Sequence, residues 1–288
     1  VTPVSFSSIA ASSFSAVAFG DFSGDLWPDA IAASSDGNGL YAFKSLGFQG
    51  WTAARAGLPV SGIYYSAILA DINSDGRREL IAGHKTDGIK IYRFNAATST
   101  WLLVAPSPLS TGETRALAAG DFDGDGWLDL AASVAGVGMR CWKQTAGGGG
   151  WSVFETGLPH TGTVNALLKA DMNLDGRADL VAARSGVGVA AYRNKDGAGN
   201  WNQLSLPAAG TGFVSLDCAD FDLDGRPDLV ACGGATGVHL LRNMGGGTAW
   251  SRVLAGDLPS ASAFNFVLFA RLDQDAAPDI AALDDADF

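Results

Sequence analysis

Acidic loops that recur along the chain carry the residues best suited to chemistry. Six such loops occur, and their first residues lie 50, 50, 50, 49 and 51 residues apart. In five of them an oxygen-bearing side chain stands at loop positions 1, 3, 5 and 9. These side chains belong to Asp21, Ser23, Asp25 and Asp29 in the first loop, Asp71, Asn73, Asp75 and Glu79 in the second, Asp121, Asp123, Asp125 and Asp129 in the third, Asp171, Asn173, Asp175 and Asp179 in the fourth, and Asp220, Asp222, Asp224 and Asp228 in the fifth.

The spacing of these oxygens suits a metal ion. Side chains at the four positions can converge on one point, and a glycine at position 6 of four loops permits the tight turn. Three or four carboxylates without nitrogen or sulfur donors select a hard cation, and Ca²⁺ accepts irregular oxygen shells more readily than Mg²⁺. We therefore predict about five calcium ions. Their role should be structural, because the loops contain no partner base or nucleophile.

Two alternatives concern individual loops. An Asx-rich turn can use its carboxylates only to cap backbone N–H groups, although capping does not require four such residues at fixed offsets. The sixth loop, residues 271–279, begins with Arg271 instead of aspartate and has Ala276 in place of the glycine. We expect this loop to hold no metal, with the guanidinium neutralising Asp273, Asp275 and Asp279.

Charge and composition exclude several classes of protein. The net charge is −11, and 20 of the 30 acidic residues lie in the six loops, which argues against nucleic acid or an anionic membrane as partner. No apolar run approaches the roughly 18–20 residues of a membrane span, so membrane insertion is not expected. Three cysteines at irregular spacing exclude a cysteine-rich zinc site. A local bridge between Cys218 and Cys232 and free buried thiols are both compatible with the sequence.

The elements that must position the loops repeat with the same period. Each period contains four short apolar segments: one before the loop, one directly after it, one after a glycine-rich turn, and one that opens with tryptophan. Segments of this length, bounded by glycine and aspartate, are typical of strands and too short for helices. The tryptophans are Trp51, Trp101, Trp151, Trp201 and Trp250.

Four antiparallel strands in about fifty residues, repeated along one chain, predict an all-β fold of the β-propeller type. We expect one domain over residues 1–288 with six blades, whose repeats start near residues 16, 66, 116, 166, 215 and 266. Stacked blades bury each other's faces. Residues 1–15 are expected to complete the last blade and close the circle. A three-stranded closing blade and a longer parent propeller are the alternatives.

The pattern Asp-x-Asp-x-Asp-Gly-x-x-Asp-Leu at this spacing resembles the FG-GAP and VCBS repeats of integrin-α-type propellers. The resemblance covers essentially the whole chain. It implies calcium in the blade hairpins, a secreted or cell-surface location and a role in recognition. The family includes integrin α heads, fungal lectins that bind sugars between blades, and accessory domains of polysaccharide-degrading enzymes. Membership leaves the ligand open.

The repeats favour a binding protein over an enzyme. His84, His160 and His239 fall at unrelated repeat positions, so no catalytic triad is indicated. The leading hypothesis is a multivalent carbohydrate-binding module. Its candidate ligand residues are Trp27 and Trp127 at loop position 7, and the basic residues Arg93, Lys143, Arg193 and Arg242, which with Lys44 close the third strands.

Each of these candidates has a structural alternative. The loop tryptophans would cover a neighbouring blade, and the basic residues would pair with nearby acids. We expect the Trp51 series to anchor the outer strands rather than to stack on a sugar. At the level of the whole protein, an integrin-like protein-binding adhesion module and a structural domain of a larger extracellular assembly are the alternatives. The oligomeric state is not indicated.

Overall fold

The computed structural model describes residues 13–104, 106–145, 150–204, 206, 212–233, 237–253, 258–259 and 263–284. Within them the regular elements are 22 strands and one short 3₁₀ helix, η1 (Gly47–Gln49). The chain forms two compact units. Unit 1 comprises residues 1–119, 126–134 and 142–152, and unit 2 comprises residues 120–125, 135–141 and 153–288.

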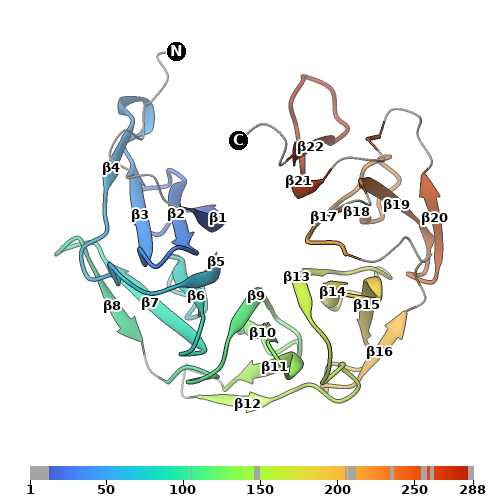
Figure 1. Ribbon diagram of the computed structural model, residues 1–288, viewed down its shortest axis with the longest axis horizontal. Coiled ribbons are helices and arrows are strands. Elements are labelled where there is room, and N and C mark those ends of the chain that lie inside the picture. The colour runs from blue at the N-terminus through green and yellow to red at the C-terminus, as the bar shows by residue number, and fades with distance from the viewer. Residues whose placement is uncertain are drawn as a thin grey trace. The chain divides into compact units, whose positions relative to one another are not determined.

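Unit 1 contains two complete four-stranded antiparallel sheets, whose strands are labelled in Figure 1. The first has the order β1-β2-β3-β4 and the second β5-β6-β7-β8. Their strands are β1 (Phe14–Gly20), β2 (Asp29–Ser34), β3 (Leu40–Ser45) and β4 (Trp51–Ala53), then β5 (Tyr64–Ala70), β6 (Glu79–His84), β7 (Ile89–Asn95) and β8 (Thr100–Val104).

Unit 2 contains two further four-stranded sheets, β13-β14-β15-β16 and β17-β18-β19-β20, and the pair β21-β22. Their strands are β13 (Val164–Ala170), β14 (Asp179–Arg184), β15 (Gly188–Asn194), β16 (Trp201–Leu204), β17 (Ser215–Ala219), β18 (Asp228–Cys232), β19 (Val238–Gly245), β20 (Ala249–Val253), β21 (Phe264–Ala270) and β22 (Asp279–Asp284). The remaining sheet, of order β12-β11-β10-β9, has residues in both units. It consists of β9 (Thr114–Gly120), β10 (Asp129–Val134), β11 (Gly138–Gln144) and β12 (Trp151–Val153).

The prediction of four short antiparallel strands in each period is confirmed for five repeats. In the part of the sixth repeat that the structure describes, two strands are present. The predicted closure by residues 1–15 lies largely outside the described residues. Phe14 and Ser15 belong to β1 of the first sheet, so that predicted boundary extends two residues too far.

The second strand of the first five repeats is buried because apolar side chains cover both of its faces, whereas β22 of the sixth repeat is only partly buried. In β2 and β18 every residue is buried, and the corresponding strands β6 and β14 are buried except at their last residue. Small side chains such as Ala30 and Ala182 leave room for close packing on either side. An alternating pattern would have left one face exposed. The continuous apolar runs of the sequence therefore correspond to strands that are buried on both faces of their sheet.

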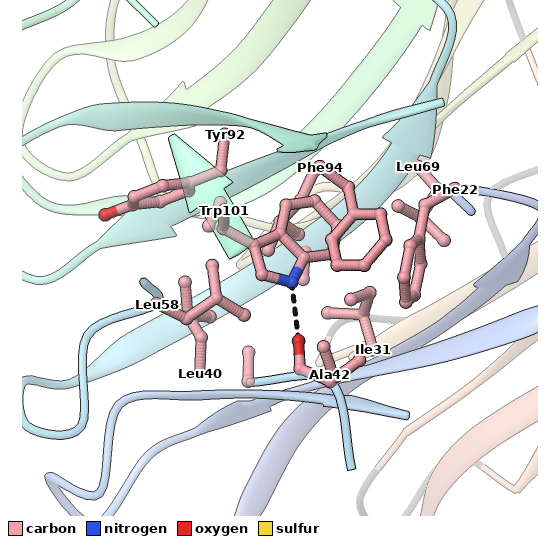
Figure 2. Packing of buried hydrophobic residues seen from close by; sticks show 14 of the residues in the cluster. Phe22, Ile31, Leu40, Ala42, Leu58, Leu69, Tyr92, Phe94 and Trp101 are labelled. Carbon is pink, nitrogen blue, oxygen red and sulfur yellow. Dashed lines mark hydrogen bonds between the residues drawn. The ribbon is translucent and has the colours of Figure 1, made fainter. Parts of the chain in front are cut away.

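The core of unit 1 joins the first sheet to the second. Phe22, at the start of the first loop, contacts Phe94 and Trp101 of the second sheet, with ring centroids 5.0 and 4.7 Å away. Figure 2 shows these rings together with Ile31 and Leu69 of the same cluster. The second residue of an acidic loop is thus an apolar anchor that fixes the loop to the neighbouring sheet.

Two tryptophans of the fourth strands, Trp101 and Trp201, anchor these strands as the sequence predicts, whereas Trp51, Trp151 and Trp250 are only partly buried. Trp101 is 2% exposed, and its indole N–H donates to the Ala54 carbonyl of the preceding repeat over 2.8 Å. Trp201 is similarly buried and donates to the Phe154 carbonyl over 3.1 Å. Since each bond joins residues 47 positions apart, both tryptophans connect consecutive repeats.

Buried asparagines form a second connection between repeats in unit 2. The Asn194 amide donates to the Phe122 carbonyl over 2.6 Å, and the Asn243 amide donates to the Met172 carbonyl over 2.8 Å. Both asparagines are fully buried. Each therefore ties the end of a third strand to the acidic loop of the preceding repeat.

Replacing Asn194 with alanine is expected to destabilise unit 2 by about 1–3 kcal/mol, because the Phe122 carbonyl would lose its buried partner. Urea denaturation would measure the change. The matched control is Asn202→Ala on the exposed face of β16, where we expect less than about 0.5 kcal/mol. Equal effects of the two substitutions would contradict this role of Asn194.

Candidate functional site

The first and fifth residues of each acidic loop fold the loop back on itself. In the fourth loop, Asp171 accepts the N–H groups of Asp175 and Gly176 over 3.1 and 2.7 Å, while Asp175 accepts that of Arg177 over 3.1 Å. The same pattern occurs in the first, second and fifth loops. These bonds are those of an Asx-rich turn, and they orient carboxylates toward the interior of the loop.

The ninth residue of each loop has a different task, which the sequence did not reveal. Asp179 is fully buried and accepts the N–H groups of Met172 and Asn194 over 3.0 and 2.8 Å. Asp29 and Asp228 do the same with the corresponding residues of their repeats. This acid therefore holds the loop against the end of the third strand. The detectable signal was a polar residue directly after the third-strand cation in four repeats, at Ser45, Gln144, Asn194 and Asn243, whereas the second repeat has Phe94 at this place.

The environment of the ninth-position acid disfavours its charge. Burial raises the pKa of the Asp179 carboxyl to about 6, while the backbone donors of Asn194 and Met172 oppose that shift. Burial also raises the pKa of Asp29, Glu79 and Asp228. Because burial disfavours the charged form of these four acids, we expect the folding stability of the metal-free protein to depend on pH.

A raised pKa in the folded state means that the folded, metal-free protein holds a proton more firmly than the unfolded chain. The stability contributed by Asp179 is fully present below its ordinary pKa of 3.8 and is lost as the pH rises through about 6. We expect the thermal midpoint of metal-stripped protein to fall between pH 4 and pH 7 less steeply in Asp179→Asn than in the unchanged protein. Parallel pH profiles for the two proteins would contradict this assignment.

In the first and fourth loops the third residue has a buried oxygen without a hydrogen-bond partner, whereas Asn73 and Asp123 in the second and third loops accept the N–H group of the fifth residue. Ser23 Oγ in the first loop and Asn173 Oδ1 in the fourth are buried and accept no hydrogen bond. In the fifth loop, one oxygen from each of Asp220, Asp222 and Asp224 lie within 4.8 Å of one another. Unsatisfied buried oxygens and gathered carboxylates form an oxygen-only donor set, which fits Ca²⁺.

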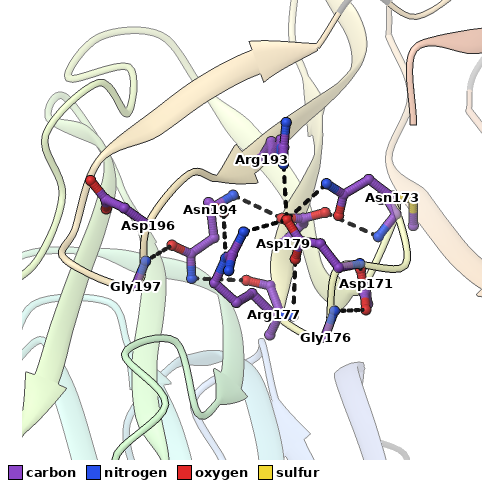
Figure 3. A network of polar contacts seen from close by, with 12 residues as sticks. Asp171, Asn173, Gly176, Arg177, Asp179, Arg193, Asn194, Asp196 and Gly197 are labelled. Carbon is purple, nitrogen blue, oxygen red and sulfur yellow. Dashed lines mark hydrogen bonds and ion pairs between the residues drawn. The ribbon is translucent and has the colours of Figure 1, made fainter. Parts of the chain in front are cut away.

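The basic residues at the ends of the third strands lie against the acidic loops of their own repeats. Lys44 Nζ is 3.2 Å from Asp25, Arg93 Nε is 3.0 Å from Glu79, and Arg193 is 3.0 Å from Asp175. Arg242 pairs with Asp222. Figure 3 shows the fourth loop, where Arg177 and Arg193 surround the acids. The ion-pair interpretation of these cations accordingly matches the structure, and Lys143, half-buried on β11, is the fifth of the series.

Two loops depart from the common arrangement. The third is divided between the units, with Asp121, Asp123 and Asp125 in unit 2 and Asp129 in unit 1, where Asp129 accepts the Gln144 N–H. In the sixth loop Asp279 still accepts the Leu272 N–H over 2.7 Å. Arg271 is exposed and forms no ion pair among the described residues, so its predicted neutralising role is wrong. Its guanidinium lies at the surface instead.

The two loop tryptophans differ in exposure. Trp27 is 43% exposed, and its ring lies 5.5 Å from that of Phe48, which is 98% exposed. Trp127 is half-buried. Phe48 was not among the predicted ligand residues, because it lies in the connection between β3 and β4 and belongs to no repeated pattern. A phenylalanine in a glycine-containing turn was the available signal.

The cysteines and histidines form no shared centre in the described part of the chain. All three cysteines are free, and burial raises the pKa of the Cys218 and Cys232 thiols to about 11. The local disulfide is therefore absent. His84 lies against Tyr64, His239 against Phe213, and His160 3.7 Å from Glu155.

Consecutive four-stranded antiparallel sheets, each with an acidic loop between its first two strands, define a repeat protein of the β-propeller class. The FG-GAP-like repeat model matches residues 71–132, 171–231 and 220–282, and the FG-GAP repeat model matches residues 114–152. Since these matches take in more than half of the sequence, the chain belongs to the FG-GAP repeat family. A comparison with curated proteins found no match.

Solved structures share the fold at low sequence identity. A lectin of Agrocybe aegerita, described as recognising non-reducing terminal N-acetylglucosamine, is similar with a TM-score of 0.56 and 16% identity, over 96% of this chain and 81% of that one. Sqt1 of Saccharomyces cerevisiae is similar with a TM-score of 0.54 and 15% identity, over 88% of this chain and 64% of that one. At such identities the likeness concerns the fold alone. Among the described residues, no helix has the length and apolar character that crossing a membrane requires.

Proposed function

We propose that this protein is a calcium-stabilised recognition module that binds glycans outside the cell, built as a six-bladed propeller and lacking enzymatic activity. The observation that carries the proposal is the repeated acidic loop: five copies of one oxygen donor set, each fastened to its own sheet. A loop with one structural task and no general base suits a scaffold better than a reaction centre.

Calcium would be held by the oxygens at positions 1, 3 and 5, with the ninth-position acid alongside them. The unpartnered Ser23 and Asn173 oxygens support this assignment because a cation would satisfy them. Bound calcium supplies positive charge that offsets repulsion among the carboxylates. The position of the loop is set by the protein itself. In the first loop, the Phe22 side chain packs into the hydrophobic core, and Asp29 at position 9 accepts the Phe22 N–H.

Glycan binding is supported by two features. The fold is similar to that of the Agrocybe aegerita lectin over 96% of this chain. In addition, an exposed aromatic pair lies beside an acidic loop, and aromatic rings with nearby polar groups suit the mixed surface of a sugar. Protein adhesion is the competing function, and it predicts recognition of a protein in place of sugars.

A glycan array probed with calcium-loaded protein, and again after chelation, tests the proposal. We expect binding to a defined set of glycans that weakens strongly once calcium is removed. Circular dichroism on the same samples would establish whether the chelated protein is still folded. Absence of binding to every glycan by folded, calcium-loaded protein would overturn the glycan assignment and favour protein adhesion.

A further inference from the structure

Four neighbouring side chains of the first repeat are apolar and exposed, and the described residues of the other repeats have no aromatic pair of this kind at the same place. We call these four the first-repeat patch: Leu26, Trp27, Leu46 and Phe48, exposed by 92%, 43%, 43% and 98%. The Trp27 and Phe48 rings meet edge to face at 5.5 Å and 73°. Exposed aromatic side chains in contact with each other, rather than with a core, are uncommon on a surface without a binding role.

The backbone holds this patch in a fixed shape. Phe48 lies in η1, and the turn is closed by a bond from the Leu46 N–H to the Gly50 carbonyl over 2.7 Å. Trp27 lies directly on Gly47, where an added Cβ would approach its ring to 3.0 Å. Glycine is therefore required beneath the indole. A preorganised surface of this kind binds with a smaller loss of conformational entropy.

The loop is strained at the patch. Leu26 has φ of 71°, in the left-handed region that favours glycine, and the corresponding residues Gly76, Gly176 and Gly225 have φ of 83–85°. Leucine in this conformation is strained, and it gains no burial in return because 92% of it is exposed. Exposed leucines with positive φ also occur at position 4 of the fourth and fifth loops, at Leu174 and Leu223, so the strain at Leu26 bears on the patch through its place beside Trp27.

The charges beside the patch select the kind of ligand. Asp25 accepts the backbone N–H of Trp27, and Lys44 lies 3.2 Å from the Asp25 carboxylate, so a carboxylate and an ammonium group stand beside Trp27. Both are about one-third exposed and can still exchange hydrogen bonds with hydroxyl groups. The surface thus offers an apolar centre and a neutral polar edge. Four side chains are too few for the roughly 800 Å² per partner of a stable protein interface.

We infer that the first-repeat patch binds the C–H face of a neutral pyranose, with Trp27 and Phe48 against the ring and the Asp25–Lys44 pair toward its hydroxyls. This inference rests on the proposed glycan-binding function and assigns it to one asymmetric site, in place of equivalent pockets in every repeat. Acidic sugars should bind less well, since the three carboxylates of the first loop, Asp21, Asp25 and Asp29, offset the charges of both a bound calcium ion and Lys44.

The test uses the full chain on immobilised neutral glycans that end in N-acetylglucosamine, galactose, glucose or mannose, with sialylated forms as the acidic arm. Phe48→Ala and Trp27→Ala are each expected to weaken binding at least about tenfold. Phe48→Tyr keeps the ring and should remain within about twofold. Leu103→Ala, an equally apolar change at a residue 61% exposed on β8, should have no effect. Thermal midpoints would show that every variant is folded.

Leu26→Gly gives an independent readout. It relieves the strained backbone and removes a contact, so the thermal midpoint should rise while glycan binding falls. Binding that survives both aromatic substitutions, or that prefers sialylated glycans, would overturn this inference and leave the proposed function intact. Failure of the unchanged protein to bind any glycan would overturn both. A change in self-association caused by Phe48→Ala, without any change in glycan binding, would reassign the patch to a contact between copies.

Discussion

Removing calcium is expected to lower the thermal midpoint of this protein by roughly 10–20 °C. Each site that is filled at a hundredfold excess over its dissociation constant adds about 2.7 kcal/mol to the folded state, and about three or four such sites suffice for a shift of this size. The acids gathered in the fifth loop, Asp220, Asp222 and Asp224, repel one another without a cation. Differential scanning calorimetry of chelated protein, titrated with Ca²⁺ and separately with Mg²⁺, would measure the shift. Mg²⁺ should have the smaller effect, since it demands a regular octahedral shell.

The fifth and sixth loops provide a matched pair of variants. Asp224→Asn should lower the number of bound calcium ions by one, because it removes charge from a complete donor set. Asp273→Asn should leave that number unchanged, because Arg271 has replaced the first aspartate of its loop. Isothermal titration calorimetry would count the ions in each variant. If millimolar calcium changes neither the midpoint nor the heat of titration, the loops are Asx turns and the calcium proposal fails.

Trp101→Ala should destabilise unit 1 by about 3–5 kcal/mol, the usual cost of deleting a buried aromatic side chain. The indole is 2% exposed and its ring lies 5.2 Å from that of Phe94 and 4.7 Å from that of Phe22, the second residue of the first acidic loop. Its loss would open a cavity and leave the Ala54 carbonyl without a partner. Urea denaturation followed by circular dichroism would give the change in the free energy of unfolding.

Two neighbouring substitutions separate the contributions to this effect. Trp101→Phe keeps most of the packing and removes the indole N–H, so its effect should be clearly smaller than that of alanine. Leu102→Ala removes a side chain that is 54% exposed on the same strand and should cost less than about 1 kcal/mol. A similar cost for Leu102→Ala and Trp101→Ala would show that the tryptophan series does not anchor the outer strands.

The sequence by itself determined the repeat, the strand order within a repeat and the position of each loop. These features are local: the oxygens of a loop lie within nine residues, and the apolar runs on either side specify strands. Each repeat contains the same acidic loop and the same apolar segments, so the period of about fifty residues could be recognised without any knowledge of long-range contacts. The anchoring role of Trp101 and Trp201 also followed from their recurrence.

Only the tertiary structure decided which groups meet across the repeats. Arg93, Arg193 and Arg242 could have faced a ligand, and the folding of the third strand back over the loop places them on acids instead. Asp179 reads as one more loop acid, yet its partner Asn194 lies 15 residues away on another strand. Trp27 and Phe48 form one surface because the β3–β4 connection returns over the loop. The spacing of residues in a sequence determines which side chains are close within one loop or strand. Contacts between different strands depend instead on how the sheets twist and pack.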